Sequence, residues 1–314
     1  MWMPRLRQFA LAASFAAVGS LLLAGCETAK YDKSAMSGES AIASQASKYW
    51  KKEGWWSLKQ KTGKIMITEF SVEYLTDTDL YMDKMSGGPL MVLDYVGVGD
   101  SKREYDQAWM QQFPAKLYIE FTQALEQQGF SVIPMQQVTS NPAFAELAKS
   151  AAGDKGSWNN RGDGTPFSPS HNERYTVYPT PGLPTVDDSW FKGGGNYKTE
   201  ARVAGEVGAD IALRVRIRVG VDDKGRALLG KGSSIHVLGS FKSAKWGDGL
   251  TWWADVTGLV VAHNGFYKDG VIADDKGFKG GSGKVYKVDC DKLAAALLEM
   301  FPSYAEMGVH VMKQ

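Results

Sequence analysis

The most specific chemical setting in this sequence belongs to Cys26. It follows Leu-Ala-Gly at positions 23–25, and this motif closes a charge-free run of apolar and small residues at positions 9–23. Two arginines precede the run, so the layout is that of a secretory signal peptide with small residues at its cleavage site. A thiol directly after the cut is what lipoprotein processing requires, because it takes up a diacylglycerol. We therefore predict a signal peptide over residues 1–25 and lipidation of Cys26, with palmitate among the acyl groups.

A single membrane-spanning helix is the alternative interpretation of this N-terminal stretch. A spanning helix needs about 20 apolar residues, and the run at positions 9–23 is shorter. One acyl chain alone holds a protein only weakly at a membrane, so we expect several chains on Cys26. Glu27 follows the cysteine, whereas an Asp at this place tends to retain enteric lipoproteins in the inner membrane. This favours the outer membrane, with the body of the protein facing the periplasm.

Three arginines alternate with apolar residues in the clearest strand pattern of the chain, at positions 209–221. Arg214, Arg216 and Arg218 lie on one side of that strand, because successive side chains of a β-strand point to opposite faces. A row of guanidinium groups could bind anionic lipid headgroups, peptidoglycan peptides or an acidic protein. The alternative is a solvated sheet face on which neighbouring acids pair with the arginines. We treat the three as candidate partner-binding residues.

Tryptophan is the second candidate residue type, with ten in the chain. Trp252 and Trp253 are adjacent in a predicted strand, so their indoles face opposite sides and one of them can be exposed. Exposed Trp side chains are enriched at protein interfaces, and they also stack on sugar rings. Packing in the core is the alternative for both residues. We therefore add Trp252 and Trp253 to the candidate partner-binding residues.

No residue pattern predicts catalysis or metal binding. The four histidines lack the spacings of zinc sites, and neither a nucleophile elbow nor a phosphate-binding loop is present. After lipidation of Cys26, Cys290 would be the remaining thiol. It could form an intermolecular disulfide, act as a reactive group or, as is more common, be an inert buried side chain. We expect no enzyme activity, cofactor or metal. With 36 basic and 35 acidic residues, the charge balance also does not favour nucleic acid.

The domain boundaries follow from composition. Residues 26–63 are predicted to be a lipidated tether, because their first half is rich in Ser, Ala and Lys and has little apolar pattern. Residues 64–314 would form one periplasmic domain. At about 153–196 this domain is interrupted by a predicted irregular insertion that is dense in Gly, Pro, Ser, Asn and Asp and also carries aromatic residues.

Within the domain, hydrophobic periodicity and the placement of Gly and Pro predict strands and helices. Strands are expected at 64–74, 90–98, 130–134, 209–221, 226–238, 252–263 and 308–312, and helices at 114–128, 141–149, 198–207 and 293–301. Strands and helices alternate at first and then give way to a meander of strands. This order is typical of an α/β (α+β) fold in which helices pack on one mixed β-sheet.

Three segments resemble a family of envelope lipoproteins. A predicted helix ending in Gly leads into Phe-Ser-Val-Ile-Pro at 130–134, a second helix ends in Gly-Ala-Asp at 208–210, and Val-Thr-Gly-Leu-Val occupies 256–260. In this combination the chain resembles the curli secretion-channel lipoproteins, the amino-terminal domain of the TolB protein and the lipoproteins that activate peptidoglycan synthases. The resemblance covers about residues 64–300 without the insertion. It implies a TolB amino-terminal-like fold that acts through protein contacts.

The lipid anchor and the resemblance predict an outer-membrane lipoprotein that serves in the assembly or secretion of an envelope structure. It would act as a scaffold or as a subunit of a ring-shaped homo-oligomer, with the membrane and envelope proteins as partners. The alternative is a peptidoglycan- or glycan-binding lipoprotein that regulates cell-wall synthesis, which the tryptophans and the aromatic insertion favour. An envelope hydrolase is a third hypothesis and rests only on scattered carboxylates.

Overall fold

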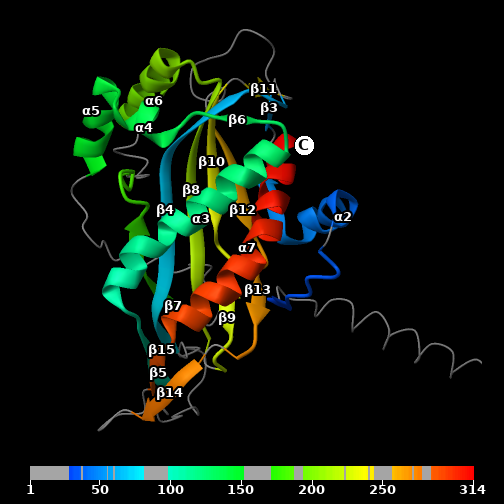
Figure 1. Ribbon diagram of the computed structural model, residues 1–314, viewed down its shortest axis with the longest axis vertical. Helices are drawn as coiled ribbons and strands as arrows, with labels where there is room; N and C mark the ends of the chain where they lie inside the picture. The colour runs from blue at the N-terminus through cyan, green and yellow to red at the C-terminus, as the bar shows by residue number, and fades with distance from the viewer. Residues whose placement is uncertain are drawn as a thin grey trace, which may run out of the picture.

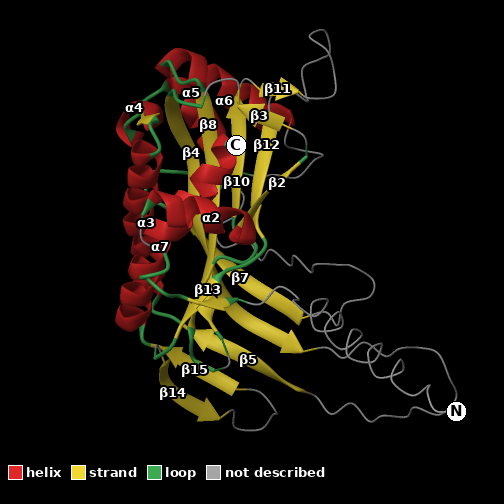
Figure 2. Cartoon of the chain, turned by 90° about the vertical axis from the view of Figure 1, so that its right-hand side faces the viewer, coloured by secondary structure: helices red, strands yellow, loops and turns green. Residues whose placement is uncertain are grey.

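The computed structural model describes residues 28–36, 38–54, 56–58, 61–80, 98–151, 171–186, 194–222, 224–239, 241–243, 257–270, 272–277 and 284–314. Over these residues the chain forms a curled, mixed β-sheet with two long helices along one of its faces (Figures 1 and 2). The expectation of helices packed on one mixed sheet is confirmed at this level.

The sheet is built around two long parallel neighbours, β4 (Lys64–Leu80) and β8 (Ile211–Val221). The main path of hydrogen-bonded strands is β1 (Ala29–Lys30), β13 (Phe266–Lys268), β9 (Ala227–Leu229), β8, β4, β5 (Val98–Glu104), β15 (Lys284–Val288) and β14 (Ile272–Gly277). A side branch leads from β8 through β10 (Ser234–Gly239) and β12 (Thr257–Ala262) to β2 (Trp50–Glu53). Two further strands border β4, namely β6 (Ser131–Val132) and β7 (His171–Pro179), while β3 (Trp56–Leu58) pairs with β11 (Phe241–Ser243) in a separate small sheet.

Two long helices, α3 (Gln107–Gln127) and α7 (Cys290–Lys313), cover one face of this sheet (Figure 2). Each begins after an aspartate, as the preference for Asp at the N-cap leads one to expect. Asp106 accepts a hydrogen bond from the Trp109 N–H, and Asp289 accepts one from the Lys292 N–H. The helix predicted from Pro114 therefore starts seven residues earlier, at Gln107, and Pro114 lies inside it.

The remaining helices lie around the rim of the sheet. Close to α7 lies α2 (Glu39–Tyr49), and α4 (Met135–Thr139), α5 (Pro142–Ala151) and α6 (Gly194–Val207) gather at one end of the molecule (Figure 1). The predicted start of α5 is confirmed, because the Asn141 side chain accepts a hydrogen bond from the Ala143 N–H at 2.8 Å. Asn141 also donates to Glu206 at 2.9 Å, which links α5 to α6.

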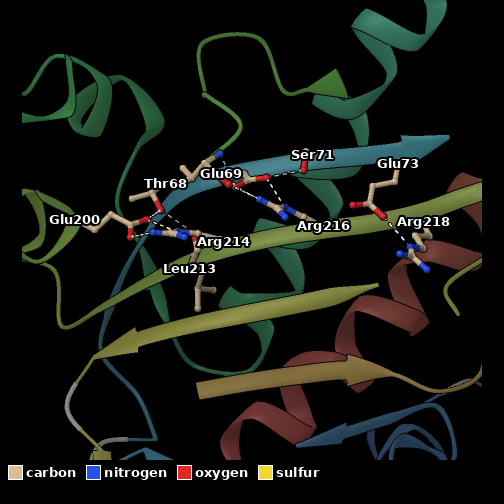
Figure 3. A network of polar contacts seen from close by, with 10 residues as sticks. Thr68, Glu69, Ser71, Glu73, Glu200, Leu213, Arg214, Arg216 and Arg218 are labelled. Carbon is tan, nitrogen blue, oxygen red and sulfur yellow. Dashed lines mark hydrogen bonds and ion pairs between the residues drawn. The ribbon is translucent and has the colours of Figure 1, made fainter. Parts of the chain in front are cut away.

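Alternation along β8 confirms the predicted period of two. Its odd-numbered residues are apolar and belong to the core, whereas its arginines point to the opposite face (Figure 3). In β4 the alternation changes phase at a β-bulge between Ile67 and Glu69. The extra residue, Thr68, moves Glu69 to the face of the arginines and leaves Phe70 on the face of α3, where its ring meets that of Phe121 at 5.7 Å.

The predicted tether over residues 26–63 is wrong for its described part. The apolar residues of α2 recur at helical spacing and are buried, namely Ile42, Ala46 and Tyr49. The next residue, Trp50, is 1% exposed, and its Nε1–H donates a hydrogen bond to the Tyr304 carbonyl oxygen at 3.1 Å. Composition suggested a tether because the apolar residues here are few. The larger ones in the described part are nevertheless buried in the core, namely Met36, Ile42, Tyr49, Trp50, Trp56 and Leu58.

The strand predicted at 308–312 is also wrong, because α7 continues to Lys313. The helix was predicted only over 293–301, and Gly308 was the first residue of the predicted strand. In the structure it is a contact point, since a Cβ atom at this position would lie 3.0 Å from the Trp50 indole. The glycine thus lets α7 approach Trp50 closely, a requirement that no local pattern reveals.

The predicted irregular insertion at 153–196 contains regular structure in its described part. Strand β7 pairs antiparallel with β4, and α6 begins at Gly194. The segment after β7 is packed as well, with Leu183 at 5% and Val186 at 0% exposure. Residues 152–170 and 187–193 lie outside the described residues. Most of the strand predicted at 90–98 lies outside them too, apart from Val98, where β5 begins.

Candidate functional site

The arginine row predicted from the sequence lies inside the protein. Arg214 is 0% and Arg216 5% exposed. A partner cannot reach these two side chains in this fold, so the exposed binding face expected from the sequence is not formed there. Each of the three arginines instead meets a glutamate on the polar face of the sheet (Figure 3).

Arg214 pairs with Glu200 of α6. Its Nε–H donates to Glu200 Oε1 at 2.8 Å, and its Nη2 forms a second, shorter contact with Oε2, so the guanidinium and carboxylate meet in a fork. The Thr68 hydroxyl lies 2.6 Å from Glu200 Oε1 and donates to it. Both charged side chains are fully buried. This pair ties α6 to β8, and the bulge residue of β4 completes it.

Arg216 pairs with Glu69 of β4 in the same forked manner. Its Nε–H and Nη2–H donate to the two carboxylate oxygens at 2.7 and 3.1 Å. Ser71 donates to Glu69 Oε1 at 2.9 Å, and the Val186 N–H donates to Oε2 at 2.9 Å. Arg216 Nη2 also donates to the Val186 carbonyl at 2.5 Å. The segment after β7 is therefore held on the sheet by both members of the pair.

Arg218 is the most accessible of the three, with 11% of its side chain exposed. Its Nε–H donates to Glu73 Oε2 at 2.7 Å, and its guanidinium lies 4.6 Å from the centre of the Tyr175 ring. Its own backbone N–H donates to the Ser233 hydroxyl at 2.9 Å. The third pair thus continues the network along β4 and β8 towards β7 and the turn before β10.

The chemistry of this network is structural. Buried charges persist when they are paired and when hydrogen bonds satisfy their remaining atoms, and Glu69 and Glu200 fulfil both conditions. The Glu69–Arg216 and Glu73–Arg218 pairs also link β4 to β8, and they fit only one register of the two strands. We call the three pairs the clamp, because together they join β4, β8, α6 and the segment after β7 at 180–186. The pairs are Arg214 with Glu200, Arg216 with Glu69 and Arg218 with Glu73.

The acidic members of the clamp were not predicted. A signal was present, because Glu69, Ser71 and Glu73 repeat with the same period of two as the arginines. Two strands with complementary charge on alternate residues favour pairing side by side. Glu200 carries no such signal, since it lies on a helix whose contact with β8 is set by the tertiary fold.

The remaining candidate residues are Cys26, Trp252, Trp253 and Cys290. Cys26, Trp252 and Trp253 are outside the described residues. Cys290 begins α7 as a free thiol, and burial raises its pKa above the ordinary value for cysteine. A raised pKa lowers the fraction of reactive thiolate, which favours the interpretation of Cys290 as an inert side chain.

Two further observations concern the described residues alone. Within them, no group of three or more His, Cys, Asp and Glu side chains is arranged to hold a metal ion. None of the helices in the same part of the chain combines the length and the apolar character needed to cross a membrane.

Comparison with known proteins gives no relative, since no protein-family model, curated protein or solved structure matches the chain. The resemblance to curli secretion-channel lipoproteins and TolB-like domains therefore stays a prediction from the sequence.

Proposed function

We propose that this chain is an outer-membrane lipoprotein whose periplasm-facing α+β domain acts through protein contacts. It would serve as a scaffold, or as a subunit of a ring-shaped complex, in the assembly or secretion of an envelope structure. The single observation that carries the proposal is the Leu-Ala-Gly-Cys motif that ends at Cys26 after a charge-free apolar run. A protein anchored in this way works at a membrane surface, where its partners are envelope components.

The buried clamp supports a role in binding over one in catalysis. The Glu69 and Glu200 carboxylates are forked onto arginines and accept further hydrogen bonds, so their oxygens are engaged in contacts that join strands and a helix. These buried ion pairs serve the rigidity of the domain. A rigid body with a covalent membrane anchor is suited to hold other proteins at a defined place.

The experiment that tests this proposal is a mass measurement on the lipidated protein. The full-length chain is expressed in an enteric host, extracted from the envelope in mild detergent and analysed by light scattering after size-exclusion chromatography. We expect acyl groups on the N-terminal peptide in mass spectrometry and a discrete oligomer in solution. Cys26→Ser is the matched control and should yield unacylated protein.

Each outcome bears on a different part of the proposal. An unacylated wild-type chain would overturn the lipoprotein assignment. An acylated monomer would exclude the ring subunit, and an acylated monomer that captures no envelope protein on cross-linking would exclude the scaffold as well. Co-sedimentation with purified sacculi by such a monomer would instead establish the peptidoglycan-binding alternative.

A further inference from the structure

The first described residues of the chain are already part of the folded body. Strand β1 runs parallel to β13, where the Ala29 N–H donates to the Gly265 carbonyl at 3.0 Å and the Tyr31 N–H donates to the Tyr267 carbonyl at 2.9 Å. The Tyr31 ring meets the buried Phe266 ring edge-on at 5.3 Å. Backbone pairing and an aromatic contact therefore hold this end of the chain.

Side chains reinforce the attachment of β1. Lys30 forms an ion pair with Asp269 at 2.7 Å, and the Tyr31 hydroxyl lies 3.4 Å from the Ser303 hydroxyl of α7. The chain then enters α2 and reaches Trp50, which is buried against Tyr304. Strand β1 and Tyr31 are thus bound to the core through β13 and α7.

The distance between the lipid and the body follows from the sequence count. Only Glu27 and Thr28 lie between Cys26 and Ala29, so three residue steps join them, and a fully extended chain spans at most about 3.6 Å per residue, or roughly 11 Å here. The polar layer of one leaflet is itself about 5–8 Å thick, from the difference between the whole bilayer and its hydrocarbon core. An acylated Cys26 therefore leaves almost no free chain between the headgroups and β1.

We infer that the surface around β1 and β13 rests on the phospholipid headgroups of the leaflet that holds the lipid anchor. This inference depends on the lipidation of Cys26 proposed above. It adds to that proposal a membrane-contact surface and a defined orientation of the body, in place of a domain that moves freely on a long tether.

The side chains at this surface suit phospholipid headgroups. Lys30 and Asp269 are more than half exposed, and Lys33, three residues after Lys30, is exposed in the turn before α2. On the other side of β13, the Arg226 guanidinium lies 4.0 Å from the centre of the Tyr267 ring. Lysine, arginine and tyrosine side chains with an apolar stem and a polar tip are favoured at membrane interfaces.

The charges at this surface are largely balanced in pairs. The ion pairs are Lys30 with Asp269, Arg226 with Asp222, and Lys268 with Glu299. Such a surface matches zwitterionic headgroups, which carry one charge of each sign, better than it matches a strongly anionic membrane. The covalent lipid and not a basic patch would supply the attraction, so we expect the contact to depend little on salt.

A spin label tests this surface directly. In a Cys290→Ser background of the full-length acylated protein, a nitroxide is attached at Lys33→Cys or, as matched control, at Glu146→Cys of α5. Both positions are exposed, and α5 lies at the end of the molecule remote from β13 (Figure 1). The proteins are placed in vesicles of phosphatidylethanolamine and phosphatidylglycerol that contain a nickel-chelating lipid.

The expected result is a relaxation enhancement by the headgroup-bound nickel that is several-fold larger at position 33 than at position 146, and that persists in high salt. A flexible Gly-Ser linker inserted between Glu27 and Thr28 should abolish the difference. Equal and small enhancements at both positions would overturn the inference. A label at 33 that stays at the headgroups despite the linker would overturn the role given to the short connection.

Failure of the inference and failure of the proposed function can be told apart. If mass spectrometry finds no acyl group on Cys26, the proposed function fails before any label is measured. If the acyl groups are present and position 33 is remote from the headgroups, the lipoprotein proposal stands and the contact surface is wrong. Thermal unfolding of each labelled protein, matched to the parent, ensures that the label reports on a folded domain.

Discussion

Along β8, Arg216 and Ile217 are neighbours in sequence and both are nearly or fully buried, yet different physics holds them. Ile217 faces the α3 and α7 side, where burial of apolar surface is favourable by itself and depends only on close packing. Arg216 faces the opposite side, where its burial is tolerable only because Glu69 and the Val186 carbonyl meet its donors. One strand therefore presents an apolar face that is held by shape and a polar face that is held by specific pairing.

This difference teaches how the domain obtains both stability and a single register. Apolar contacts tolerate small shifts, because many arrangements bury similar area. A forked ion pair tolerates few, because a displaced guanidinium leaves a buried carboxylate unsatisfied. The apolar face thus supplies most of the stability, and the polar face selects one arrangement of β4, β8 and α6.

The largest effect on stability is expected when one member of a fully buried ion pair is removed and the other is left behind. Arg214→Met leaves the buried Glu200 carboxylate without the guanidinium that it binds, and should lower the free energy of unfolding by about 3–5 kcal/mol. The double variant Arg214→Met/Glu200→Leu removes both charges and should recover most of that loss. Urea denaturation measures both values. A double variant no more stable than the single one would contradict the pairing.

The next test compares substitutions on the apolar and the polar face of β8. Ile217→Ala creates a cavity and should cost about 2–5 kcal/mol, whereas Ile217→Val should cost only about 0.5–1.5 kcal/mol. Arg214→Lys keeps the charge but loses the fork, so its loss should exceed that of Ile217→Val. Thermal and urea unfolding check the order. If Arg214→Lys costs no more stability than Ile217→Val, the charge alone and not the forked geometry holds the polar face.

Within the clamp, we expect a smaller loss of stability from a more exposed pair. Arg218 and Glu73 keep 11% and 5% exposure of their side chains, in contrast to the fully buried Arg214 and Glu200. We expect Arg218→Met to lower the free energy of unfolding by about 1.5–3 kcal/mol, because water can partly solvate Glu73. The same denaturation series provides the measurement. A loss larger than that of Arg214→Met would show that burial does not set the order.

The smallest effect is expected from an ion pair at the surface of the same helix. Arg202 lies two residues after Glu200 on α6 and pairs with Glu146 of α5, with 47% and 60% of the two side chains exposed. Arg202→Gln should change the free energy of unfolding by less than about 1 kcal/mol. Glu200→Gln is the matched control on this helix and should cost more. Equal losses for the two variants would remove the contrast between buried and exposed charge.

Local features of the sequence predicted much of the fold. The alternation in β8, the Asn cap of α5 and the strand at the start of β4 were all expected, because backbone geometry fixes these patterns within a few residues. For the candidate site, the arginines were singled out and their neighbouring acids were not. The period of two in Glu69, Ser71 and Glu73 was available as a signal, but the bulge at Thr68 that places it on the arginine face was not.

Two of the misjudged segments, the predicted tether and the predicted strand at 308–312, share one physical cause. The predicted tether is folded because Trp50 meets Tyr304, which is 254 residues away along the chain, and Gly308 leaves room beside α7 for the same tryptophan. Few apolar residues in a segment give a weak local signal, yet each gains its full burial energy once a distant surface receives it.

The sequence by itself determined the features that depend on neighbours along the chain, namely the two-sided pattern of β8 and the class of the fold, and it carries the Leu-Ala-Gly-Cys motif from which we predict lipidation of Cys26. Only the tertiary structure decided that Arg214 and Arg216 are internal, that Glu200 pairs with Arg214, and that the described residues between 28 and 58 belong to the body. The reason is physical, since alternation assigns a side chain to a face, while burial depends on which distant element covers that face.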